Sequence, residues 1–232
     1  MNLENKEELN ENDGQKKKII ACKTLEEEIL AYKPSDIEAM FIESGYHRYP
    51  DQLRELLQNY IDTIDDADVL ILGYGLCSNG VSDLDSKDKI LVIPRFHDCI
   101  GILLGSRKRY DEEFKKEPGT YYLSKGWIDE LREPYSEYKE YVEKYGEEMA
   151  KWSIEMQYKN YKRLVFISSE NLGYQQEYED YAKKVADFLG VKFEVMREKS
   201  TVFENLRLDE LKGNTDFLVV MPGERVDFNK FF

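Results

Sequence analysis

A series of short apolar runs, separated by segments with helical periodicity, most strongly constrains the fold of this chain. The runs are mostly continuous rather than alternating, which is typical of strands buried on both faces of a sheet. They lie at Lys18–Ala21, Ala39–Ile42, Val69–Gly73, Ile90–Pro94, Leu164–Ser168, Phe193–Met196 and Phe217–Met221. The clearest helical patterns lie at Leu25–Tyr32, Pro50–Ile64 and Gln175–Leu189, the last followed by the helix-stop residue Gly190. This order predicts an α/β fold, doubly wound, with a mostly parallel sheet and helices on both faces.

The alternation of strands and helices is interrupted between residues 106 and 162. This segment is rich in Lys, Glu and Tyr and has a long helical run near Glu137–Tyr161. We interpret residues 106–162 as a helical insertion or connector between two Rossmann-like lobes, residues 17–105 and 163–232. Residues 1–16 are rich in Asn, Glu and Lys and are expected to form a disordered tail.

Charge and hydropathy argue against two classes of binding partner, nucleic acids and membranes. The formal net charge is -14, which repels a phosphate backbone and argues against nucleic-acid binding. The short basic run Lys16–Lys18 leads directly into an apolar strand, so we interpret it as a solvated flank. No apolar stretch approaches the roughly 20 residues that span a bilayer, and no signal peptide is visible. We therefore expect a cytoplasmic protein that contacts no membrane and, in a reducing compartment, forms no disulfide framework.

All three cysteines and both histidines follow predicted strands. Cys22 ends the first strand, His47 follows the second, Cys77 the third, and His97 and Cys99 the fourth. Because ligands of open α/β sheets bind beyond the carboxyl ends of the strands, these side chains are candidates for one functional site. The alternative is that the cysteines are packing residues, since free Cys is commonly buried.

Thiolates and imidazoles are ligands suited to zinc, iron–sulfur clusters or copper. His97 and Cys99 lie two positions apart, and Cys77 and Cys22 complete a candidate set of four metal ligands. Four protein ligands would close a structural zinc site, whereas three would leave a position open for water or a substrate. Three cysteines also suit a [4Fe–4S] cluster with one distinct iron. The spacing matches no standard zinc-ribbon or ferredoxin motif.

A metal-free alternative uses the same residues as catalytic groups. Cys99 is placed at the start of a predicted helix, where a thiol has a lowered pKa and becomes a nucleophile. His97 would then be its general base.

A glycine-rich segment, Gly73–Gly80, follows the third strand and is predicted to lead into a helix. Loops of this kind bring backbone N–H groups to a phosphate or carboxylate. We therefore predict that Gly75, Ser78, Gly80 and Arg107 bind an anionic part of a ligand. The pattern lacks the dinucleotide fingerprint and the Walker A motif, and a simple tight turn is the alternative.

A further glycine- and tyrosine-containing segment, Pro118–Ser124, precedes Gly126 and Trp127. It is either a lid over the site or a turn followed by a packed strand.

Three of these loops carry a family resemblance. LGYGLCSNG, PRFHDCIGILLGS and PGTYYLSKGW resemble the DUF1638 domain proteins, and the layout fits from IIAC to VVMPGERV. Lys23 departs from the pattern, which has a small residue there. The resemblance implies a companion of corrinoid-dependent methyl-transfer systems, in which related methyltransferases activate a thiol at a His-x-Cys and Cys zinc site.

Residues and resemblance together give two functional hypotheses. The first is a metal-dependent enzyme of one-carbon or corrinoid-dependent methyl metabolism, which activates a thiol or small anionic substrate with Zn2+ or a [4Fe–4S] cluster. The second is a non-catalytic metal-binding accessory protein whose partner is a corrinoid protein or methyltransferase.

Overall fold

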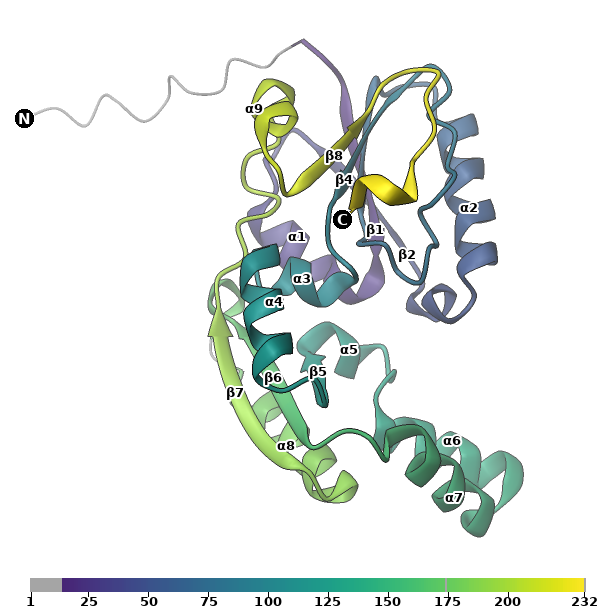
Figure 1. Cartoon of the computed structure of the whole chain (residues 1–232), viewed down its shortest axis with the longest axis vertical. Helices are drawn as coiled ribbons and strands as arrows, with labels where there is room; N and C mark the ends of the chain where they lie inside the picture. The colour runs from purple at the N-terminus through teal and green to yellow at the C-terminus, as the bar shows by residue number, and fades with distance from the viewer. Residues whose placement is uncertain (1–13, 174, 232) are drawn as a thin grey trace, which may run out of the picture.

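The computed structural model describes residues 14–173 and 175–231 and contains two β-sheets, one above the other in Figure 1. The first sheet has five strands in the order β2-β1-β3-β4-β8, and the second has three in the order β5-β6-β7. The strands are β1 (Lys17–Cys22), β2 (Glu38–Ile42), β3 (Val69–Gly73), β4 (Ile90–Pro94), β5 (Thr120–Ser124), β6 (Arg163–Ser169), β7 (Lys192–Glu198) and β8 (Phe217–Val220). The predicted tail at residues 1–16 lies mostly outside the described residues.

Helices surround both sheets. The α-helices are α1 (Glu26–Tyr32), α2 (Pro50–Thr63), α3 (Cys99–Leu103), α4 (Arg107–Lys116), α5 (Lys125–Asp129), α6 (Pro134–Tyr145), α7 (Glu147–Tyr158), α8 (Gln176–Leu189) and α9 (Leu208–Gly213). The short 3-10 helices are η1 (Lys23–Leu25), η2 (Ser44–Arg48), η3 (Glu170–Leu172) and η4 (Phe228–Phe231). Pro50 at the start of α2 and the left-handed Gly190 after α8 fix these ends as the sequence predicted.

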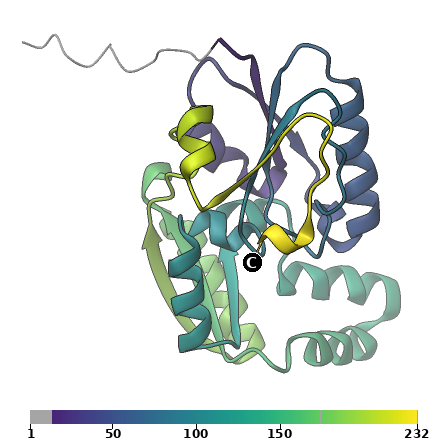
Figure 2. The same cartoon turned by 45° about the horizontal axis from the view of Figure 1, so that its top comes forward.

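The first sheet is doubly wound, as predicted. Its strands β1 to β4 pair in parallel, and successive residues of each strand point to opposite faces. Ile20 and Leu72 face α2, where they pack with Leu57. Ile19 faces the other layer, which contains Ile29 of α1. Figure 2 shows α2 and α9 on opposite sides of this sheet.

The predicted lobe boundaries need correction at two strands. β5 lies within residues 106–162, the predicted helical insertion, yet it pairs in parallel with β6 in the second sheet. β8 was assigned to the second lobe but returns to the first sheet, where it pairs antiparallel with β4. Neither pairing is visible in local sequence, because a strand's partner is chosen by burial against distant parts of the chain.

The two lobes share one apolar core. Val165 and Ile167 of β6 belong to the same buried cluster as Ile19 and Val92 of the first sheet, with Ile102 of α3 among them. A polar contact also links the lobes, because the Ser44 hydroxyl donates to the Glu130 carboxylate at 2.9 Å. A cleft between the lobes is therefore held at its base by continuous packing.

The long helical run predicted near Glu137–Tyr161 is a hairpin of two helices. Gly146, with φ +82°, separates α6 from α7 and allows the chain to reverse. The hairpin extends from one end of the second lobe (Figure 1). Met149, Trp152 and Met156 are about half exposed along α7, at 52%, 59% and 46%.

Candidate functional site

The three cysteines follow three adjacent strands of the first sheet. Cys22 is the last residue of β1, Cys77 follows β3, and Cys99 follows β4 as the first residue of α3. Because the strand order is β1-β3-β4 and all three run in parallel, their carboxyl ends lie side by side. All three cysteines are free. The structure therefore brings them to one edge, as the sequence predicted.

The thiols are close enough to affect one another's ionisation. Burial raises the pKa of Cys77, and the nearby Asp98 and Cys22 raise it further. Burial, Asp98 and the other two thiols raise the pKa of Cys99 well above its ordinary value. Burial also raises the pKa of Cys22, whose sulfur accepts a hydrogen bond from the Thr24 hydroxyl at 3.2 Å. Near neutral pH all three are therefore neutral thiols.

Cys77 sits in a strained turn. Cys77, Ser78 and Asn79 have φ values of +46°, +55° and +71°, three consecutive non-glycine residues in the left-handed region. Such conformations are unfavourable for side-chain-bearing residues and concentrate at functional sites. The Gly80 N–H donates to the Cys77 carbonyl at 3.1 Å and closes the turn. This turn carries the central thiol of the three.

The turn is tied to the loop that carries Cys99. The Leu76 N–H donates to the Phe96 carbonyl at 2.8 Å, and the Cys77 N–H donates to the His97 carbonyl at 3.0 Å. A Cβ on Gly75 would lie 2.8 Å from both backbone N and O of Asp98. Glycine is therefore needed for the loops after β3 and β4 to approach this closely.

Asp98 caps the helix that Cys99 begins. Its Oδ1 accepts from the Ile100 N–H at 2.9 Å, and its Oδ2 accepts from the Tyr110 hydroxyl at 3.3 Å. Burial raises the pKa of Asp98. The cap fixes the position of the Cys99 backbone beside the cleft.

Two buried polar atoms beside the thiols lack hydrogen-bond partners among the described residues. They are the Tyr74 hydroxyl and the Trp127 indole N–H. Tyr74 is 3% exposed, and burial together with the Cys22 and Cys77 thiols raises the pKa of its phenol. Trp127 lies close enough to Cys99 to lower that thiol's pKa slightly, without the geometry of a normal hydrogen bond. Buried polar groups are normally satisfied by a protein group, an ordered water or an ion, so these two atoms call for such a partner.

The predicted metal-ligand set is only partly assembled. Within residues 14–173 and 175–231, no group of three or more His, Cys, Asp or Glu side chains already stands in a metal-binding arrangement. His97, the fourth predicted ligand, is exposed, and its ring lies against Tyr110 with a centroid distance of 5.8 Å.

The metal-free hypothesis stays a prediction, although the pKa of Cys99 moves in the direction opposite to the one it assumes. It required a lowered pKa at Cys99, whereas burial raises this pKa. The helix that Cys99 begins has only five residues, so its dipole is too short to offset the loss of solvation.

The residues of the predicted anion site have other local roles in the structure. No helix follows the glycine-rich segment, because residues 77–83 form turns that lead towards β4. Ser78 is exposed, and a Cβ on Gly80 would lie 2.8 Å from the Leu53 side chain, so Gly80 serves packing. Arg107 donates to the Phe231 carbonyl at 3.0 Å and ties α4 to the C-terminal segment.

A cleft of about 690 Å³ opens between the lobes beside Cys99. Pro118–Ser124 was expected to be a lid or a turn with a strand, and it proves to be the second, since β5 forms one wall of the cleft. His47 also lines the cleft, with its ring edge-on to Trp127 at 4.9 Å and its Nδ1 on the Ser44 carbonyl. The cleft is further lined by Arg48, Asp98, Tyr110, Tyr121, Tyr122, Arg132, Glu137, Tyr158 and Tyr161.

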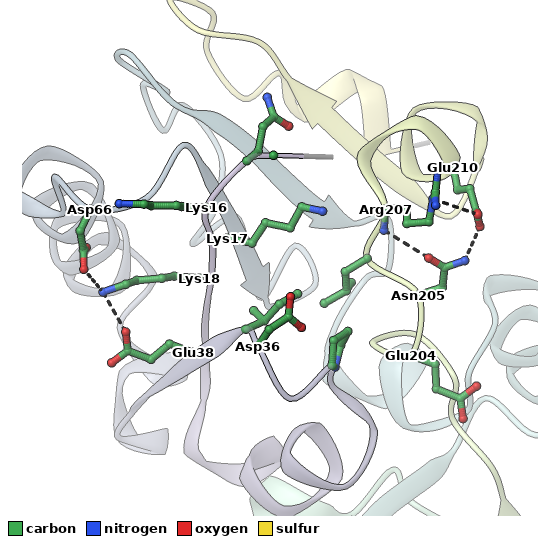
Figure 3. Close-up of a pocket in the computed structure, with 15 residues that line it drawn as sticks. Lys16, Lys17, Lys18, Asp36, Glu38, Asp66, Glu204, Asn205, Arg207 and Glu210 are labelled. Atoms are coloured by element: carbon green, nitrogen blue, oxygen red, sulfur yellow. Dashed lines mark hydrogen bonds and ion pairs between the residues drawn. The ribbon is translucent and has the colours of Figure 1, made fainter. Parts of the chain in front are cut away.

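A second hollow lies at the opposite, amino-terminal edge of the first sheet. It has a volume of about 520 Å³ and is lined by Lys16, Lys17, Lys18 and residues near Arg207. Figure 3 shows Lys18 between Asp66 and Glu38, at 2.7 and 2.9 Å. Acidic side chains thus compensate Lys18, whereas Lys16 is exposed and Lys17 is half-buried at the start of β1.

Sequence analysis missed several residues around the cleft. Arg48, Arg132 and Tyr110 carried no motif of their own, whereas Tyr74 lies within the glycine-rich segment Gly73–Gly80, although no role was predicted for it. Only their proximity in sequence to Cys77, His47, Trp127 and Arg107 could have drawn attention to them.

The comparisons with known proteins give a family and no solved homologue. A family model described as "Protein of unknown function (DUF1638)" matches residues 41–207, which include Cys77, Cys99 and Trp127 but not Cys22. No curated protein and no solved structure matches the chain. Within the described residues, no helix is long and apolar enough to cross a membrane. Since the match covers more than half of the chain, the protein belongs to the DUF1638 family.

Proposed function

We propose that Cys22, Cys77 and Cys99 bind one metal centre and that the protein is a metal-dependent enzyme acting on a small ligand in the cleft between the lobes. One observation carries this proposal: three free cysteines lie beyond the ends of three adjacent parallel strands, around the unpartnered Tyr74 hydroxyl. All three also pack in the apolar core, so the test below must distinguish metal binding from packing alone.

The donor set fits a thiophilic centre. Thiolates bind Zn2+ or hold a [4Fe–4S] cluster, and three of them leave one coordination position or one iron open. The elevated pKa values of the free thiols are compatible with this, because a bound cation removes the mutual repulsion of thiolates and drives their deprotonation. The centre would supply a Lewis acid at the edge of the cleft.

The protein's own residues would orient the substrate. Trp127 and Tyr110 lie on the cleft side of Cys99, and Asp98 holds the start of α3 in place. The link to one-carbon or corrinoid-dependent methyl metabolism is supported by the family resemblance.

A second candidate is the non-catalytic accessory protein, and the exposed face of α7 favours it. Met149, Trp152 and Met156 lie three and four residues apart, so they share one helix face. Exposed clusters of Met and Trp are typical of protein-contact surfaces. A corrinoid protein or methyltransferase would be the partner.

The first test is elemental analysis and an absorption spectrum of protein purified without oxygen. We expect about one zinc, or about four irons with a brown chromophore, per chain. The Cys77→Ser, Cys99→Ser double variant should lose the metal, and the matched His97→Gln variant should keep it, since His97 is exposed. Wild-type protein that holds no metal, even after anaerobic reconstitution, would contradict the proposal.

The two candidates are separated by a thiol methyl-transfer assay with the metal-loaded protein alone. Turnover without companion proteins supports the enzyme. Stable co-purification with a corrinoid protein that is lost in Trp152→Ser, together with no turnover alone, supports the accessory role.

A further inference from the structure

We infer that the cleft between the lobes binds a planar aromatic ligand that bears a carboxylate or similar small anion, and that the Arg132 guanidinium holds the charge. This deepens the proposed function by naming a substrate class, and it rests on that proposal because Cys99 lines the same cleft.

The walls of the cleft are aromatic. Tyr121 lies edge-on to Tyr158 and to Tyr161, with ring centroids 5.5 and 5.4 Å apart. Tyr158 and Tyr161 also contact one another at 5.9 Å. Tyr110 and Trp127 line the cleft as well. Such an array offers ring faces and edges to a flat π-system.

The positive charge of the cleft is concentrated on one side chain. Arg48 is ion-paired with Glu137, so its charge is compensated. Burial, with Arg48 and Arg132 nearby, lowers the pKa of His47, which leaves that ring neutral. Arg132 forms no ion pair with any described residue, and its Nε–H is buried without an acceptor.

An unpaired guanidinium in a cleft is unusual in a chain of net charge -14. Carboxylates are abundant here, yet none of the described ones forms an ion pair with Arg132, and Glu140 interacts with it only at longer range, where Arg132 helps to lower the Glu140 pKa. Arginine donors match a planar anion in a forked geometry, and a buried donor without an acceptor is unfavourable until one binds. The Trp127 indole N–H is a second unpartnered donor in the same cleft.

The size of the cleft agrees with a small molecule. Its volume of about 690 Å³ lies within the range of small-ligand sites, roughly 300–1,000 Å³. The three requirements of the ligand are therefore a flat ring, one anionic group, and dimensions of a few fused rings at most.

The test uses metal-free wild-type protein and three probes of matched shape. They are naphthalene-2-carboxylate, the neutral naphthalene-2-carboxamide, and the saturated decahydronaphthalene-2-carboxylate. Calorimetry should show that the aromatic carboxylate binds about tenfold more tightly than either of the others, as expected for one charge-assisted contact or one stacked ring. Equal affinities, or no binding of any probe, would overturn the inference.

Two variants assign the charge to Arg132. Arg132→Gln should abolish the preference for the carboxylate over the carboxamide, whereas Arg132→Lys should retain part of it. Arg225→Gln makes the same change of net charge at a side chain that is 66% exposed beside Asp85, and it should bind all three probes like the wild type. Circular dichroism melting curves identify any variant that fails to fold. A preference unchanged in folded Arg132→Gln would overturn the assignment.

This experiment is independent of the metal measurement. Metal-free protein that discriminates the probes, in a chain that never takes up metal, leaves the ligand inference standing and overturns the proposed function. A chain that binds metal through its cysteines but does not discriminate the probes overturns the ligand inference and leaves the proposed function standing.

Discussion

At the scale of single residues, the site depends on backbone positions that few side chains tolerate. Cys77, Ser78 and Asn79 adopt left-handed conformations in succession, and Gly75 passes within contact of the neighbouring loop. The hydrogen bonds from Leu76 and Cys77 to the loop after β4 hold this arrangement. The strain of the turn is thus offset by the pairing of two loops, and the result is a fixed position for Cys77 relative to Cys99.

Replacing Gly75 with Ala tests this dependence. The added Cβ would lie 2.8 Å from the Asp98 backbone and the Phe96 carbonyl, so one loop must shift. We expect unfolding free energy to fall by about 1–3 kcal/mol, measured by chemical denaturation. The control is Gly213→Ala, where a Cβ meets no atom within 4 Å and stability should hardly change. Equal stability of the two variants would refute the close-packing interpretation.

At the scale of elements, a buried ion-pair network fixes the second sheet against α4. Arg163 of β6, 4% exposed, donates to Glu113 of α4 at 3.1 Å and to Glu194 of β7 at 2.8 Å. Its Nε–H donates to the Thr120 hydroxyl of β5 at 3.0 Å. One side chain therefore joins all three strands to the helix, and α4 in turn presents Tyr110 to the cleft.

Arg163→Met should be strongly destabilising. It leaves the Glu113 carboxylate buried with reduced compensation, and we expect a loss of about 3 kcal/mol in unfolding free energy. The control is Lys192→Met, which removes another positive partner of Glu194. Because Lys192 is 73% exposed, this change should lower the unfolding free energy by less than about 1 kcal/mol. The double variant Arg163→Met, Glu113→Leu should recover much of the loss. If Arg163→Met proved as stable as Lys192→Met, the ion-pair network would not be needed for stability.

At the scale of the whole molecule, the two lobes share one apolar core. Ile167 in β6 and Ile19 in β1 belong to the same buried cluster, although they lie in different sheets. Gly126 adds a second junction, since a Cβ there would lie 1.9 Å from the Thr24 carbonyl oxygen. We therefore expect the two walls of the cleft to unfold together.

Ile167→Ala tests this cooperativity from a distance. Truncating a side chain that is 2% exposed should lower unfolding free energy by about 2–5 kcal/mol. Hydrogen exchange should show that the backbone amides of β1, in the other lobe, become less protected by the same free energy as the global loss of stability. Leu131→Ala, at a residue 66% exposed, should leave protection unchanged. Loss of protection confined to the second sheet would mean that the lobes unfold independently.

The sequence by itself determined the fold class and the edge at which the cysteines lie. Continuous apolar runs require strands buried on both faces, and parallel strands place their carboxyl ends together. Local chemistry also set the start of α2 at Pro50 and the end of α8 at Gly190. These features follow from nearest-neighbour geometry, which is why the position of Cys22, Cys77 and Cys99 could be predicted.

Only the tertiary structure decided which of those residues belong together. The sheet to which β5 and β8 belong, the exposure of His97, and the binding of Arg107 to the Phe231 carbonyl depend on residues far apart in the chain. The same holds for Arg132, because the absence of an ion-pair partner among the described residues has no local signature. Burial and pairing are non-local, because they depend on which surfaces the whole chain brings into contact, and the short-range sequence pattern does not encode that choice.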